Sequence, residues 1–131
     1  MDLGLCGKRL ESVEPGYTLI LRLSDLYVIA ISSPLTIELG GKSIRLSPED
    51  DPEELFGPLQ GLVGQEIDVA NTDPDGALNV SFDGGGRVRV EPDPAYEAWN
   101  VSGPGGTLVV STPGGKLAIW SAENADGRTE D

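Results

Sequence analysis

The stretch TLILRLSD, residues 18–25, carries the pattern that decides the fold. Its leucines recur at every second position, and this period predicts a half-buried β-strand, because successive side chains of a strand point to opposite faces. Similar runs follow, separated by turns rich in glycine and proline. They are YVIAI (27–31), LTIEL (35–39), SIRL (43–46), ALNVSF (77–82), RVRV (87–90), TLVVS (107–111) and KLAIW (116–120). The pattern predicts an all-β fold of about ten short antiparallel strands.

The same stretch has a counterpart in the second half of the chain. TLILRLSD aligns with ALNVSFDG (77–84), and the preceding GLCGKRLESV (4–13) aligns with GLVGQEIDVA (61–70). These matches predict an internal duplication with pseudo-twofold symmetry. Two such halves can form either an antiparallel β-sandwich or a partly closed barrel, and both alternatives stay open.

A further alignment sets the limits of the two copies. IELGGKSIRL (37–46) matches VSTPGGKLAIW (110–120), with a Gly-Gly-Lys turn in each. The chain is short enough for one domain, 1–131. Within it we predict copy one at 3–46, an acidic linker helix at 47–60, copy two at 61–120 and a disordered tail at 121–131.

Two short helical turns are predicted outside the strands, near residues 52–56 and 94–99. Asp51 and Asp93 are typical N-cap residues, and a proline at the first helical position follows each of them. The second turn lies in PDPAYEAWN (92–100), a segment that has no counterpart in the first copy. It therefore breaks the predicted symmetry.

The composition disfavours several classes of function. A net charge of −13 argues against binding to nucleic acids or anionic membranes, which attract Lys and Arg, but it permits a basic protein partner. Histidine is absent, which excludes histidine-dependent hydrolases and histidine-containing zinc sites. The single cysteine, Cys6, aligns with the apolar Val63, and this predicts a buried, inert thiol. We expect no enzymatic activity, no cofactor and no metal.

Two groups of residues are candidates for binding a partner or ligand. The first is the acidic run Glu49, Asp50, Asp51, Glu53 and Glu54. It is either a solvated helix start, where the helix dipole favours acids, or a surface for a basic partner. The second group, in the inserted segment, is Asp93, Tyr96, Glu97 and Trp99. The Trp99 ring either closes the core beneath the insertion or belongs to a contact surface, where Tyr and Trp are common.

The last third of the chain carries a distinctive series of motifs. Pro-Asp-Pro at 92–94 precedes Tyr-Glu-Ala-Trp at 96–99, a Gly-Pro-Gly-Gly turn at 103–106, and a Pro-Gly-Gly hairpin that leads to Trp120. With these motifs the chain resembles a family of short, acidic, uncharacterised proteins from high-GC Gram-positive bacteria. The resemblance implies a bacterial protein, but it implies no activity and no functional residue.

Two functions are compatible with these observations. One is a non-catalytic acidic protein-binding module, such as an inhibitor of the immunity-protein or antitoxin type that neutralises a basic partner. The alternative is a small-ligand-binding barrel or sandwich with a pocket near Tyr96 and Trp99. The N-terminal residues contain no long apolar run, so we expect neither a signal peptide nor a membrane anchor, and a cytoplasmic location. The oligomeric state stays open.

Overall fold

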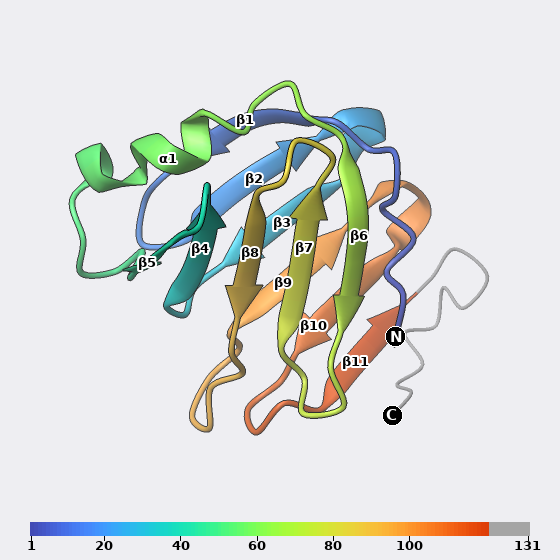
Figure 1. Cartoon of the computed structure of the whole chain (residues 1–131). Coiled ribbons are helices and arrows are strands. Elements are labelled where there is room, and N and C mark those ends of the chain that lie inside the picture. The colour runs from blue at the N-terminus through green and yellow to red at the C-terminus, as the bar shows by residue number, and fades with distance from the viewer. Residues whose placement is uncertain (121–131) are drawn as a thin grey trace.

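The computed structural model describes residues 1–120, and the predicted tail at 121–131 lies outside the described residues. The described chain forms eleven short strands (Figure 1). They are β1 (Leu10–Glu14), β2 (Leu19–Leu23), β3 (Val28–Ile31), β4 (Leu35–Leu39), β5 (Lys42–Leu46), β6 (Ile67–Thr72), β7 (Leu78–Phe82), β8 (Arg87–Val90), β9 (Trp99–Ser102), β10 (Leu108–Ser111) and β11 (Leu117–Trp120). The helical elements are α1 (Gly57–Gln60) and the 3₁₀ helices Ser24–Leu26, Glu53–Phe56 and Pro104–Gly106.

The strands form two antiparallel sheets that pack face to face. Sheet I has the strand order β1-β2-β3-β9-β10-β11, and sheet II has the order β5-β4-β8-β7-β6. Figure 1 shows the sheets as two stacked layers, with β6, β7 and β8 of sheet II nearest the viewer. Each sheet ends in a strand with a single neighbour, so neither closes on itself. Of the two predicted alternatives, the fold is the sandwich.

The hydrophobic core lies between the sheets and is built from alternate strand positions. Leu19, Leu21 and Leu23 of β2 are buried, whereas Arg22 between them is exposed. From sheet II, Val88 belongs to the same cluster of buried side chains. Burying one such side chain contributes roughly 1.5–3 kcal/mol, so the alternation determines which face of each strand turns inward.

The first hairpins of the two halves have the same register. Leu10 of β1 pairs with Leu23 of β2, and the aligned Ile67 of β6 pairs with Phe82 of β7. In both hairpins the ladder shifts immediately after this pair, at a β-bulge or similar irregularity. Aligned sequences therefore form equivalent local structures, irregularity included.

The two hairpins contact each other through matched backbone hydrogen bonds. The Leu10 amide donates to the Gln65 carbonyl at 2.9 Å, and the Ile67 amide donates to the Lys8 carbonyl at 2.8 Å. Leu10 aligns with Ile67 and Lys8 aligns with Gln65, so a twofold rotation exchanges the two bonds. This agrees with the expected pseudo-twofold symmetry, and the duplication itself stays a prediction.

The remaining strands of each half cross to the opposite sheet. β4 pairs with β8, and β9 pairs with β3, so each half completes the sheet that the other half begins. These ladders make β9 and β10 the counterparts of β4 and β5. The alignment of 37–46 with 110–120 is therefore wrong, and β11 has no counterpart. That alignment was guided by Gly-Gly-Lys turns, whose chemistry suits any tight hairpin.

One of the two predicted helical turns is confirmed and the other is wrong. A 3₁₀ helix spans Glu53–Phe56 and continues into α1. The segment near 94–99 contains no helix, because Asp93 makes only a side-chain turn and the chain then extends into β9. Pairing of Trp99 with Ile31 requires this extended backbone. Among the described residues, no helix has the length and apolar character of a membrane span.

The prediction of a buried Cys6 is also wrong. Cys6 is exposed, and its aligned residue Val63 is 40% exposed. The preceding residues in the two copies, Leu5 and Leu62, are buried instead. An apolar counterpart therefore did not indicate burial, because the inward position lies one residue earlier.

Candidate functional site

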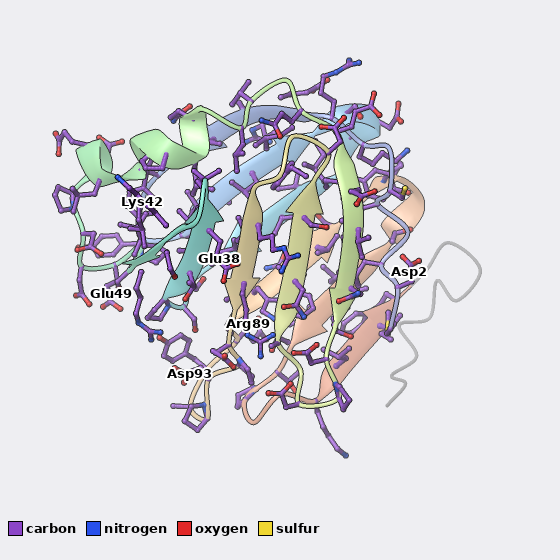
Figure 2. All side chains as sticks on the ribbon, viewed as in Figure 1. Asp2, Glu38, Lys42, Glu49, Arg89 and Asp93 are labelled. Carbon is purple, nitrogen blue, oxygen red and sulfur yellow. The ribbon has the colours of Figure 1, made fainter. Side chains whose placement is uncertain are left out.

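The outward face of sheet II is polar and combines strands from both halves. Val88 and Val90 are buried in the core, so Arg87 and Arg89, which alternate with them on β8, point outward. Figure 2 shows Arg89 and Glu38 on this face of the sheet. We call this surface the polar face and define it by Thr36, Glu38, Asn71, Asn79, Ser81, Arg87 and Arg89, which are neighbours in the strand ladders.

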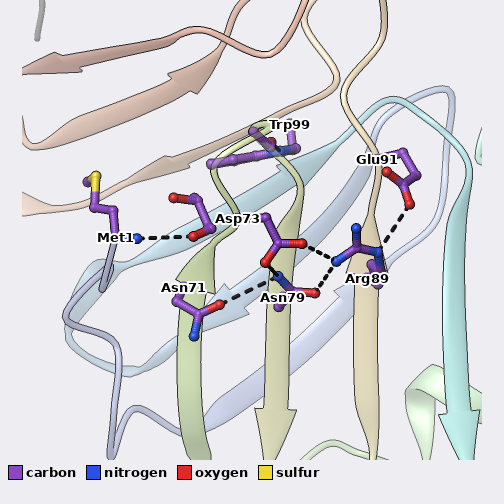
Figure 3. Close-up of polar contacts among 9 residues, drawn as sticks. Met1, Asn71, Asp73, Asn79, Arg89, Glu91 and Trp99 are labelled. Atoms are coloured by element: carbon purple, nitrogen blue, oxygen red, sulfur yellow. Dashed lines mark hydrogen bonds and ion pairs between the residues drawn. The ribbon is translucent and has the colours of Figure 1, made fainter. Parts of the chain in front are cut away.

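A network of hydrogen bonds fixes the Arg89 guanidinium at one end of the polar face (Figure 3). Its Nη1 donates to Asp73 Oδ2 at 2.5 Å and to Asn79 Oδ1 at 2.7 Å, and its Nε donates to Glu91 Oε1 at 3.1 Å. The Asn79 amide also donates to Asp73 Oδ1 at 2.9 Å. Arg89 is thus held between two carboxylates and one amide.

The network shifts the pKa values of Asp73 and Arg89 in opposite directions. The hydrogen bond from Arg89 is the main cause that lowers the pKa of Asp73, and partial desolvation opposes it. The charge of the N-terminal ammonium on Met1, which donates to the Thr72 carbonyl at 3.0 Å, lowers this pKa further. The bond to Asp73 in turn raises the pKa of Arg89. Both groups are therefore charged near neutral pH.

An open cavity of about 490 Å³ lies over the polar face. Its lining includes Arg87 and Glu38, which are direct neighbours across β8 and β4. Within residues 1–120 the Arg87 side chain forms no ion pair, so its guanidinium is available to a ligand. The cavity offers hydrogen-bond donors and acceptors. The described residues contain no group of three or more His, Cys, Asp or Glu that could hold a metal ion.

A second open cavity, of about 640 Å³, lies where the N-terminus meets two turns. Its lining includes Met1 and residues 72–76 and 114–117. The two turns touch at Gly76 and Gly115, where a Cβ atom on either residue would collide with the backbone of the other. Glycine at both positions therefore permits this close approach.

The acidic run is held in a defined turn between β5 and the 3₁₀ helix. The Ser47 amide donates to Asp51 Oδ2 at 2.7 Å, and the Ser47 hydroxyl donates to Asp50 Oδ2 at 3.2 Å. The Asp51 amide donates back to the Ser47 carbonyl at 2.9 Å. Two of the five carboxylates, those of Asp50 and Asp51, therefore order the turn.

The other three carboxylates of the run, on Glu49, Glu53 and Glu54, are exposed. In the described part of the chain, none of the five acids forms an ion pair. Leu55 follows directly and is 48% exposed. The segment thus presents unpaired negative charge beside an exposed apolar side chain.

Of the candidate residues in the inserted segment, Trp99 lies in the core, whereas Tyr96 and Glu97 lie on the surface. Trp99 is only 1% exposed, and its Nε1 donates to the Gly76 carbonyl at 3.1 Å, which confirms that the ring closes the core. Tyr96 is 42% exposed and Glu97 is also exposed. The Asp93 carboxylate accepts the Ala95 amide at 2.7 Å. Neither Tyr96 nor Trp99 lines the two cavities described above.

The structure does not join the acidic run and the inserted segment into one described cavity. Figure 2 shows Glu49 and Asp93 on two different loops, and neither residue lines the cavity over the polar face. The sequence interpretation missed the polar face altogether. A signal was present in the alternation of Arg87 and Arg89 with valine, in a chain with nine basic residues. Its significance depends on knowing which strands lie beside β8.

Comparison with known proteins adds a family and no activity. No curated protein and no solved structure matches the chain. A family model matches residues 1–121 and confirms the expected membership of an uncharacterised family, while the bacterial source and the motif signature stay predictions. Because the match covers all of the described residues, 1–120, the protein belongs to the Family of unknown function (DUF6188).

Proposed function

We propose that this protein is a non-catalytic protein-binding module whose acidic run, residues 49–54, binds a basic protein. One observation carries the proposal: five carboxylates occupy six consecutive positions, and none of them has a cationic partner among the described residues. The net charge of −13 adds a long-range field of the same sign.

Physical chemistry connects this arrangement with binding. Like charges held close together repel, and an approaching basic surface removes that repulsion. Long-range attraction also raises the association rate, and salt screens it. Leu55, exposed beside the acids, supplies apolar contact area that charge alone does not. The turn at Ser47 orders the segment beforehand, which lowers the entropy lost on binding.

In this proposal the protein is a cytoplasmic inhibitor of the immunity-protein or antitoxin type. It acts without a cofactor and does not bind nucleic acid or membrane. The absence of histidine supports a role without acid–base catalysis at neutral pH. The alternative ligand pocket near Tyr96 and Trp99 has no support from the geometry, because the Trp99 ring is buried.

Matched charge variants test the proposed surface. The triple variant E49Q/E53Q/E54Q removes three exposed charges and leaves Asp50 and Asp51, which order the turn, unchanged. The control E11Q/D68N/D83N removes three exposed charges from other parts of the surface. Wild type and both variants are immobilised, and basic proteins retained from a cell lysate at low and moderate salt are identified by mass spectrometry.

We expect one stoichiometric, salt-sensitive partner that the acidic-run variant binds more weakly. Three exposed ion pairs of about 0.5 kcal/mol each correspond to roughly a tenfold rise in the dissociation constant. The control variant should bind about as well as wild type. Equal weakening of both variants would assign the effect to net charge and not to this surface. Wild type that retains no partner at low salt would refute the proposed function.

A further inference from the structure

Each sheet ends in two edge strands, and three of these four edges are protected within residues 1–120. The β6 edge is covered by the N-terminal segment, whose Leu3 amide donates to the Ala70 carbonyl at 2.9 Å. The β1 edge begins with backbone hydrogen bonds to residues 64–66, and its ladder contains a register shift. The β5 edge carries Lys42 and Arg45. Covering segments, irregular ladders and charged side chains all prevent an edge from pairing with another chain.

The fourth edge, β11, has none of these protections in the described part of the chain. Its sequence, LAIW, contains neither a charged residue nor a proline. It lies at one end of sheet I, where β10 is its one neighbour (Figure 1). No described residue outside β10 forms a backbone hydrogen bond with it. A strand of this kind presents backbone groups that are ready to pair with a further strand.

The phase of the β10–β11 ladder shows which backbone groups of β11 are used. The Thr112 amide donates to the Lys116 carbonyl at 2.8 Å, and this bond closes the hairpin. Hydrogen-bonded pairs alternate with pairs that are not hydrogen-bonded along an antiparallel ladder. Counting from the closing pair, Ala118 and Trp120 are the residues of β11 that bond to β10.

The neighbouring β9–β10 ladder gives the same assignment independently. Its hairpin closes with the Gly103 amide, which donates to the Thr107 carbonyl at 2.9 Å, so Val109 bonds to β9. Val109 therefore does not bond to its partner on the other side, Ile119. The N–H and C=O groups of Leu117 and Ile119 point outward from the edge of the sheet. They are two donors and two acceptors at the spacing of a strand.

The second cavity lies beside these free backbone groups. Leu117 and Ile119 line it together with Met1 and residues 72–76, and its volume is about 640 Å³. Both side chains pack against the core, so the cavity lies on the inner side of β11. Its volume is within the range of binding pockets, about 300–1,000 Å³. A strand paired with β11 would place every second side chain over this cavity.

The backbone and the cavity together define the chemistry of the occupant. Donors and acceptors that alternate at strand spacing are complementary to another extended peptide. The Leu117 and Ile119 side chains favour an apolar side chain at every second position of that peptide. Residues 121–131, SAENADGRTED, contain no apolar side chain larger than alanine and do not meet this requirement. The net charge of −13 favours lysine or arginine at the flanking positions.

We propose that β11 is a docking edge for an extended segment of another protein, which adds to sheet I as a further strand. The segment bonds to the backbone of Leu117 and Ile119 and directs alternate apolar side chains into the second cavity. Basic residues flank these side chains. The site is separate from the acidic run, because no residue of the acidic run lines this cavity. It therefore goes beyond the proposed function and does not depend on it.

Random short peptides displayed on phage are the probe, and they are selected on the immobilised full chain. We expect the selected peptides to share apolar residues at alternate positions, with lysine or arginine beside them. The peptide that is enriched most is then synthesised with a fluorescent label. Fluorescence anisotropy gives its dissociation constant for wild type and for each variant.

Two N-methylated forms of this peptide test the backbone hydrogen bonds on the unaltered protein. The amides of alternate residues in a strand point to opposite edges. Methylation of one alternate set removes the donors that face β11, and the dissociation constant should rise at least about tenfold. Methylation of the other set should change it by less than about twofold, because those amides face water. Equal effects of both sets would exclude strand addition.

The variant I119K tests the location, and I44K is its matched control. Both isoleucines lie on edge strands, are half-buried and pack against the core. An inward lysine on an edge strand opposes pairing, and at Ile119 it also repels the basic residues of the peptide. I119K should raise the dissociation constant at least about tenfold. I44K and the acidic-run variant E49Q/E53Q/E54Q should bind the peptide about as well as wild type.

Several results would overturn the proposal. They are a selection that yields no peptide or no alternate apolar pattern, a folded I119K that binds like wild type, and peptide binding that is lost in the acidic-run variant. If circular dichroism shows that I119K does not fold, the two N-methylated peptides decide on wild type. Sedimentation velocity without peptide tests another occupant: a dimer that I119K abolishes would assign the edge to a second copy. A failure to retain a basic protein from a lysate would refute only the proposed function, because peptide selection does not use the lysate.

Discussion

Replacement of Trp99 by alanine is the most direct test of the core. The side chain is 1% exposed at the start of β9, where it pairs with Ile31 of sheet I. Its Nε1 donates to the Gly76 carbonyl in the turn after β6, so one residue joins the inserted segment to sheet II. Its loss should therefore affect global stability and not only the local loop.

The magnitude follows from two separable contributions. Truncation of a buried tryptophan to alanine removes apolar contact and leaves a cavity, at a cost of about 3–5 kcal/mol. Trp99→Phe keeps most of the apolar contact but leaves the Gly76 carbonyl without its donor, and this costs about 1–3 kcal/mol. Small domains have a total stability of about 5–15 kcal/mol, so W99A should be close to unfolding and W99F clearly folded.

Urea unfolding, followed by far-ultraviolet circular dichroism, measures these differences. Tyr96→Ala is the matched control, because this neighbouring aromatic is 42% exposed, and it should change the free energy of unfolding by less than about 0.5 kcal/mol. A W99A loss below about 1 kcal/mol, or equal losses for W99A and Y96A, would refute the assignment of Trp99 to the core.

Two further predictions concern the polar network and a strained turn. Arg89 lowers the pKa of Asp73 in the folded state, so the stabilisation is present above the unfolded pKa of about 3.9 and is lost as the pH falls below it. The difference in unfolding free energy between wild type and D73N should shrink from pH 6 to pH 2, and a constant difference would contradict this ion pair. Leu26 has a φ of 68° and is 80% exposed, so L26G should stabilise the protein by about 0.5–1 kcal/mol, since leucine is unfavourable in this conformation. L55G is the control: Leu55 does not have a positive φ, so its replacement by glycine should destabilise the protein. A lower melting temperature for L26G than for wild type would count against strain at this turn.

The local features of this protein were predictable because they depend on neighbouring residues. The alternation in TLILRLSD identified β2 and its buried face, since strand geometry turns every second side chain inward. The sequence predicted the helical turn after Asp51, although Pro52 and not Asp51 is its N-cap and no side chain caps it. The same signals at Asp93 misled, because pairing of β9 with β3 overrides a weak local preference for a helix.

Of the two candidate surfaces, the acidic run could be predicted from the sequence and the polar face could not. The acidic run is continuous in sequence, and the structure adds that none of its carboxylates forms an ion pair within residues 1–120. The polar face brings β4, β6, β7 and β8 together, from both halves of the chain. No local pattern predicts that Glu38 lies beside Arg87, because that neighbourhood follows from the exchange of strands between the sheets.

The sequence by itself determined that the protein is built from short antiparallel strands with defined inner and outer positions, because hydrophobic periodicity and turn chemistry act over a few residues. Only the tertiary structure decided which strands pair, that β9 and not β10 takes the position equivalent to β4, and that Arg87 and Arg89 of sheet II lie beside strands from the other half of the chain. Strand pairing joins residues far apart in the chain, and the arrangement that buries the inner faces of both halves together selects it.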